Sequence, residues 1–151
     1  MSASARDVAR AIDALRRGWS IAIAAPGEAT MPLLAVETAD PIGLESFVGG
    51  GTFPLLISNG RAATLKLTNQ LAAADPDTPV AIEPAPWLDF STAVALADPQ
   101  FDLATPLKGP FRTMAINRPA ASLAAIRLAR IAGLLPAFVL DGAGAEVTID
   151  P

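Results

Sequence analysis

Two residues at a predicted helix start, Arg118 and Ser122, have the chemistry of an anion site. Between them, Pro119 suits the first helical turn, because a proline lacks the N–H that would have no helical partner there. The free N–H groups of that turn and the positive end of the helix dipole favour an anion. The pair also fits a simpler alternative, a solvated arginine beside a serine that caps the helix.

The segment that positions this pair is predicted to be a helix followed by a strand. From Pro119 onward, apolar side chains recur at the three- and four-residue spacing that lines one helix face, and Gly133 marks the helix end. The stripe consists of Ala121, Ala124, Ala125, Leu128, Ile131 and Ala132. Residues 135–140 are apolar and follow a turn signal, which indicates a buried strand packed against the helix.

The chain of 151 residues contains neither histidine nor cysteine. It therefore lacks the commonest general base, the commonest transition-metal ligand, and any thiolate nucleophile or disulfide. Carboxylates, lysine, arginine and hydroxyls remain for chemistry. The net charge of −4 and the isoelectric point near 4.7 argue against a nucleic-acid partner, which would need a basic surface.

Length and hydropathy predict one domain over residues 1–151. No apolar run reaches the roughly 18 residues that span a bilayer, and the N-terminus, MSASARDVARAID, lacks the apolar stretch of a signal peptide. We therefore expect no membrane partner and a cytoplasmic location. The hydrophobic content of 52% is high. Either a partner subunit or a further domain covers part of the apolar surface, or the value simply reflects the many alanines.

The order of patterns predicts an α+β fold with α/β-type layers, a mixed β-sheet flanked by helices. Further helices are expected at about 5–17, 42–48, 61–71 and 91–97, and further strands at 19–25, 31–37, 53–58, 80–83 and 111–116. Strands 19–25 and 31–37 should pair through the turn between them. Gly49, Gly50 and Gly51 form either a flexible helix stop or a phosphate cradle, although the spacing of a phosphate-binding loop is absent.

Several stretches together resemble the 3,4-dihydroxy-2-butanone 4-phosphate synthase family of riboflavin biosynthesis. They are AIDALRRG, GGGTFPLLIS and RPAASLAAIRLARIAGLLPAFVL. In this resemblance Arg118 stands on the family's arginine and Ser122 on its threonine, and both family residues contact the substrate phosphate. Ala121, however, occupies the place of the metal-binding histidine, and Leu123 that of a glutamate.

The resemblance also implies a second loss after the first predicted strand. The family carries there an acidic run that supplies acid/base groups and a magnesium ligand. This chain has AAPGEATM from Ala24 to Met31, in which Glu28 is the only carboxylate. Glu28 is a weak metal candidate, because one carboxylate without a second ligand makes a poor magnesium site. We therefore expect no magnesium site, no catalytic residues and no synthase activity.

The segment ALADPQFDLATPLKGPF resembles the synthase-like region that precedes GTP cyclohydrolase II in certain bacterial proteins. This implies a catalytically silent domain, N-terminal to a cyclohydrolase whose zinc-binding cysteines lie downstream, with a structural or dimerisation role. The family is generally homodimeric, which implies a homodimer here. The end at AEVTIDP is compatible with a cut before a second domain, and a chain that stands alone with another role is the alternative.

Two other functions remain open. One is a regulatory module that binds a phosphorylated metabolite through Arg118 and Ser122. The other is an active enzyme, such as the synthase itself, that uses carboxylates including Glu28, Glu37 and Glu45. The last two also fit an ordinary strand end and an exposed helix position, and nothing in their spacing brings them together.

Overall fold

The computed structural model describes residues 4–67, 78–102 and 111–151. Its helices are α1 (Ala5–Arg16), α2 (Pro41–Val48), α3 (Asn59–Thr64), α4 (Phe90–Ala97) and α5 (Pro119–Ala132), with a 3₁₀ turn, η2 (Pro99–Phe101). Its strands are β1 (Ile21–Ile23), β2 (Met31–Ala35), β3 (Leu55–Ile57), β4 (Val80–Ile82), β5 (Thr113–Met114), β6 (Ala137–Leu140) and β7 (Val147–Ile149). Helices and strands interleave along the chain without strict βαβ regularity, as the sequence pattern predicted.

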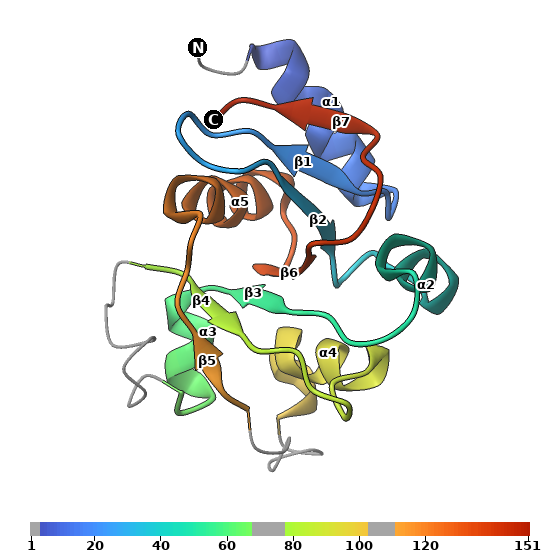
Figure 1. Ribbon diagram of the computed structural model, residues 1–151, viewed down its shortest axis with the longest axis vertical. Helices are drawn as coiled ribbons and strands as arrows, with labels where there is room; N and C mark the ends of the chain where they lie inside the picture. The colour runs from blue at the N-terminus through green and yellow to red at the C-terminus, as the bar shows by residue number, and fades with distance from the viewer. Residues whose placement is uncertain (1–3, 68–77, 103–110) are drawn as a thin grey trace.

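The described strands form one mixed sheet in the order β5-β4-β3-β6-β2-β1-β7. The neighbours are antiparallel except β1 and β7, which run parallel. The predicted pairing of the first two strands is confirmed, with Ile21 opposite Leu33. β6 lies between β2 and β3, and it brings the segment after α5 into the middle of the sheet (Figure 1).

Helices cover both faces of this sheet, which confirms the predicted α+β fold with layers. Alternate side chains of a strand point to opposite faces. Phe138 therefore packs in the core under α1 and α5, while Val139 packs in the core on the side of α2, α3 and α4. Burial of both faces explains why the strands read as continuous apolar runs rather than as alternating patterns.

The helix ends follow from local side chains. Ser4, Asp40, Ser58 and Asp89 each accept a backbone N–H of the first turn that has no helical partner. Two helices end at glycines in the left-handed region, α2 at Gly49 with φ +76° and α5 at Gly133 with φ +74°. Gly133 thus ends the helix that the sequence predicted, and the triple glycine includes the stop of α2.

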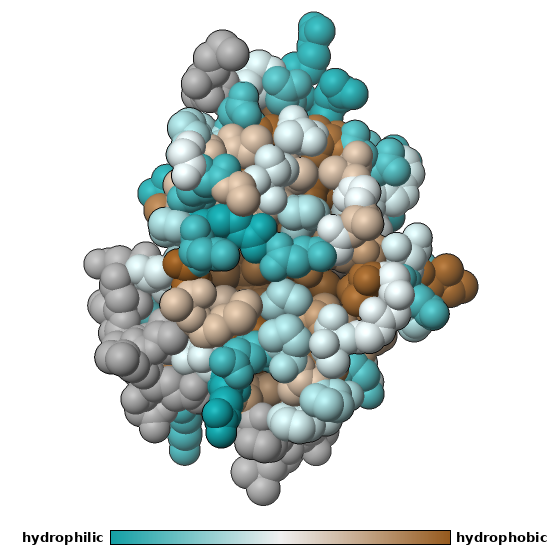
Figure 2. All heavy atoms as spheres, viewed as in Figure 1, coloured by the Kyte–Doolittle hydropathy of each residue, from teal (hydrophilic) through white to brown (hydrophobic). Residues whose placement is uncertain are grey.

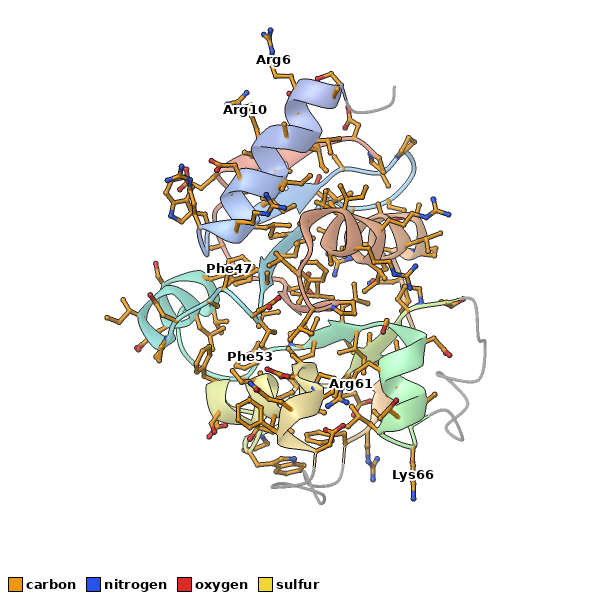
Figure 3. All side chains as sticks on the ribbon, turned by 180° about the vertical axis from the view of Figure 1, so that it is seen from behind. Arg6, Arg10, Phe47, Phe53, Arg61 and Lys66 are labelled. Carbon is orange, nitrogen blue, oxygen red and sulfur yellow. The ribbon has the colours of Figure 1, made fainter. Side chains whose placement is uncertain are left out.

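A buried arginine joins α3 to α4. Arg61, only 7% exposed, forms two 2.8 Å hydrogen bonds with the carboxylate of Asp102. Its guanidinium also donates to the carbonyls of Ala95 and Leu96 at the end of α4, at 3.2 and 2.6 Å. Figure 3 shows Arg61 between the two helices. The buried guanidinium is therefore neutralised by a carboxylate and hydrogen-bonded to two carbonyls, so it links α3 to the end of α4 without leaving an unpaired charge in the core.

The structure departs from the sequence-based expectations in several places. Ile131, expected in the apolar stripe of α5, is 65% exposed. A strand, β7, forms near the C-terminus, where the sequence pattern predicted no further element. α3 ends at Thr64, and the remainder of the helix predicted over 61–71 lies partly outside the described residues. β5 comprises two residues, although 111–116 was expected to be extended. None of the described helices is both long and apolar enough to cross a bilayer.

Candidate functional site

The first turn of α5 is held by a residue from a distant loop. Arg118 stands at the N-cap position and makes no side-chain capping bond, so the N–H groups of the first turn need other partners. Glu28, between β1 and β2, supplies them. Its Oε2 accepts the N–H of Ala120 at 2.9 Å and its Oε1 the N–H of Ala121 at 3.0 Å. The carboxylate is an internal anion at the positive end of the helix.

Arg118 lies beside this cap but binds other groups. Its Nη2 is 2.6 Å from Oδ1 of Asp141, directly after β6, and its Nη1 donates to the carbonyl of Thr30 at 3.4 Å. The side chain is 12% exposed, and its Nε is buried without a hydrogen-bond partner among the described residues. The guanidinium therefore connects the loop before β2 to the end of β6. One of its donors remains unused.

Ser122 faces inward. It is 2% exposed, and its hydroxyl lies 3.9 Å from the sulfur of Met31, a weak acceptor. Its backbone N–H donates to the carbonyl of Arg118 at 2.9 Å as part of the helix. The serine hydroxyl thus does not cap α5, which differs from the simpler alternative of the sequence analysis. The cap is Glu28.

The positions that the resemblance marked as altered carry apolar side chains. Ala121 is fully buried in the core beneath α1 and α5. Leu123 is half-buried and lines a cavity of about 230 Å³, together with residues such as Ser58 and Arg130. Neither position offers a proton donor or a metal ligand.

Magnesium would require a different set of donors. Both oxygens of Glu28 accept backbone N–H groups, and Oδ1 of Asp141 pairs with Arg118. Magnesium prefers a near-octahedral shell of oxygens that are free to coordinate it. Among the described residues, no three His, Cys, Asp or Glu side chains gather into a group that could hold a metal. The residues at the start of α5 therefore fit the ion poorly.

The other carboxylates of the sequence analysis lie elsewhere. Glu37, just after β2, accepts the N–H of Leu135 at 2.6 Å and so connects two loops. Glu45 is exposed on α2, where it lines a groove beside Gly50 and Gly51. The structure gathers Glu28, Arg118 and Asp141, and it leaves Glu37 and Glu45 outside this group.

Two members of the cluster, Asp141 and Thr30, were not predicted from the sequence. Asp141 has a positive φ of +65°, and its N–H donates to the carbonyl of Pro32 at 3.1 Å. A lone Asp before a Gly at the end of an apolar strand was the available signal, but it is also common in turns. Thr30 contributes only its backbone carbonyl, which no sequence pattern reveals. Figure 2 shows a band of hydrophilic surface across the middle of the molecule, at the level of α5.

The fold places the chain in a known structural class, a mixed sheet layered between helices. The same fold is found in solved structures of 3,4-dihydroxy-2-butanone 4-phosphate synthase. The cation-free synthase has a TM-score of 0.58 and 17% identity, with 93% of this chain and 77% of that chain covered. A complex of the synthase with two magnesium ions has a TM-score of 0.58 and 18% identity, covering 93% and 78%.

A two-domain synthase, RibBX from A. baumannii, has the same fold in part. Its TM-score is 0.50 and its identity 17%, with 94% of this chain and 49% of that chain covered. No family model matches the sequence, and no curated protein is significantly similar to it. The synthase-like fold that the sequence resemblance implied is thus confirmed.

Proposed function

We propose that this chain is a catalytically silent 3,4-dihydroxy-2-butanone 4-phosphate synthase-like domain with a structural role. One observation carries the proposal. The carboxylate of Glu28 binds the N–H groups of Ala120 and Ala121, at the helix start where the resemblance places the phosphate of the family's substrate. The chain fills this position with its own anion, and a substrate phosphate would have to displace it.

The neighbouring residues support the same proposal. The rearrangement catalysed by the family needs positioned acid/base groups and oxyanions stabilised by a metal. Ala121 and Leu123 provide neither, and Glu28 has no oxygen free of a backbone N–H. Arg118 is paired with Asp141, so the one cation of the cluster already has a carboxylate partner.

For the whole protein, we propose a GTP cyclohydrolase II of riboflavin biosynthesis with this domain at its N-terminus. The support is the sequence resemblance at residues 95–111, part of which lies outside the described residues, and the occurrence of the fold in a two-domain protein. Zinc would then belong to the downstream domain alone. The domain would contribute folding, domain contacts or homodimerisation, in a bacterial cytoplasmic enzyme.

The test uses the natural full-length protein. We expect no consumption of ribulose 5-phosphate in the presence of magnesium, while GTP hydrolysis proceeds and is abolished by a zinc chelator. An active synthase assayed alongside confirms that the assay works. Turnover of ribulose 5-phosphate would refute catalytic silence. A natural reading frame that stops after Pro151 would refute the cyclohydrolase assignment.

One observation favours a second function, a module that binds a phosphorylated metabolite. The buried Nε of Arg118 has no partner among the described residues and could donate to an anion that displaces Asp141. Calorimetry with ribulose 5-phosphate, GTP and inorganic phosphate tests this on the wild type, Arg118→Ala and Ser122→Ala. Saturable heat that disappears in Arg118→Ala supports the module. Equal, negligible heats for all three proteins exclude it.

A further inference from the structure

A groove of about 450 Å³ lies between the end of α2 and the start of α4, on the helix layer away from α1 and α5. Its lining comes from three segments: one side of α2, residues 50–53 and the residues around the start of α4. Figure 3 shows Phe53 beside α4, where this groove is formed. The volume suits a few side chains of a ligand.

The lining combines apolar surface with negative charge. Leu44, Phe53 and Leu88 provide buried apolar side chains, while Glu45 and Asp89 provide exposed carboxylates. None of the described residues that line the groove is basic. Glu45 makes no side-chain hydrogen bond with the described part of the chain, so its charge is available to a ligand. An occupant with an apolar body and a positive charge matches both features.

The glycine segment adds a third feature. Gly50 and Gly51 both have φ near +85°, a conformation that other residues adopt rarely, and a Cβ added at either position would meet open space. The backbone N–H and C=O groups of residues 50–52 make no hydrogen bond within the described part of the chain. They are exposed, and they can pair with the backbone of another chain.

We propose that this groove binds an extended peptide segment in which apolar residues flank an arginine or lysine. The apolar side chains would enter beside Phe53 and Leu88, and the cation would meet Glu45 and Asp89 at the rim. The peptide backbone would pair with residues 50–52. The proposal does not depend on the proposed function, because it uses none of Glu28, Arg118 and Asp141.

The test is a titration of the protein followed by ¹H–¹⁵N NMR, with Ac-Leu-Arg-Leu-NH₂ as the probe and Ac-Leu-Glu-Leu-NH₂ as its oppositely charged match. Peptide is added to about 10 mM, because a short segment with few anchors binds in the millimolar range. We expect saturable shifts of the amides of Gly50, Gly51, Thr52 and Phe90 with the basic peptide alone. Raising the salt concentration should weaken the binding.

Two variants and one control locate the charges. Glu45→Gln removes a free carboxylate, and Asp89→Asn removes a charge while retaining a good helix cap. The double variant should bind the basic peptide about fivefold to tenfold more weakly, because two exposed charge pairs are lost. Glu146→Gln alters an exposed carboxylate outside this groove and should leave the affinity unchanged.

Three results would overturn the proposal. Equal binding of the acidic and basic peptides would show that the carboxylates do not select the ligand. Shifts confined to other residues, or no saturable shifts, would show that the groove does not bind such a segment. Shifts of residues 50–52 that depend on protein concentration without peptide would assign the groove to a second copy of the chain.

Discussion

Glu28 and Ala121 lie 93 positions apart in sequence, and the carboxylate of the first accepts the N–H of the second at 3.0 Å. Together with the hydrogen bond from the N–H of Ala120 to the same carboxylate, this bond holds the loop between β1 and β2 against the first turn of α5. The helix start therefore has a charged cap that comes from another part of the chain. It is the geometric basis of the proposed function, and it can be tested through stability.

Replacing Glu28 by alanine should lower the free energy of unfolding by about 1–2 kcal/mol, because two N–H groups and the helix dipole lose their anion. Glu28→Gln should cost less, since its amide oxygen still accepts one N–H. Chemical denaturation measures both. Glu146→Gln, which removes a carboxylate without a hydrogen bond among the described residues, provides the baseline. A Glu28→Ala protein as stable as this control would show that the cap contributes nothing.

Arg61 should be far more important for stability than the exposed Arg17. Arg61→Ala removes the guanidinium that binds Asp102 and donates to two carbonyls at the end of α4, and it should lower the free energy of unfolding by about 3 kcal/mol or more. Arg17 pairs with Asp13 at 2.9 Å on the surface of α1, and Arg17→Ala should cost less than about 1 kcal/mol. Denaturation of the two variants gives the comparison. Similar losses of stability in the two variants would contradict the importance of the hydrogen bonds that Arg61 makes.

Gly142 should not tolerate a side chain. A Cβ at this position would overlap the ring and the carbonyl of Phe47, and backbone cannot move aside cheaply. Gly142→Ala should destabilise the protein by about 1–3 kcal/mol. At Gly60, in α3, a Cβ would meet only open space, and the φ of this glycine is ordinary. Gly60→Ala should therefore be neutral or stabilising by up to about 1 kcal/mol. Thermal unfolding distinguishes the two, and a harmless Gly142→Ala would refute the packing argument.

Asp89 should make stability depend on pH in the acid range. The N–H of Thr92 donates to it at 2.9 Å and, with a smaller effect of the threonine side chain, holds the pKa of Asp89 below its ordinary value of 3.8. The native state therefore favours the ionised form. The stabilisation is complete above pH values near 3.8 and is lost as the pH falls through the lower, native pKa.

Asp89→Asn keeps an acceptor for the cap, so this part of the acid dependence should disappear while the helix remains capped. Urea unfolding of the wild type and the variant between neutral pH and about pH 2 measures the difference. The stabilities of the wild type and the variant should converge toward low pH, where the carboxylate of Asp89 is protonated. Curves that stay parallel over the whole range would show that Asp89 is not the group responsible.

The local elements could be predicted from the sequence because their signals are local. Pro119 and Gly133 bracket α5, Asp40 and Ser4 cap α2 and α1, and apolar runs mark the main strands. The residues that give the resemblance also implied the correct fold. β7 was not predicted, because three residues with one exposed, polar member carry little pattern of their own. This strand forms because it pairs with β1, which lies far from it in the sequence.

The candidate site could be predicted only in part. The sequence by itself determined the start of α5, the place of Arg118 beside it and the absence of histidine and cysteine from its chemistry. Tertiary structure decided which groups meet there. Glu28 reaches the helix, Asp141 takes Arg118, and Ser122 turns inward, because β1, β2 and β6 bring distant loops to one end of α5. Periodicity and caps act within a few residues, whereas partners across the sheet are set by strand order and register.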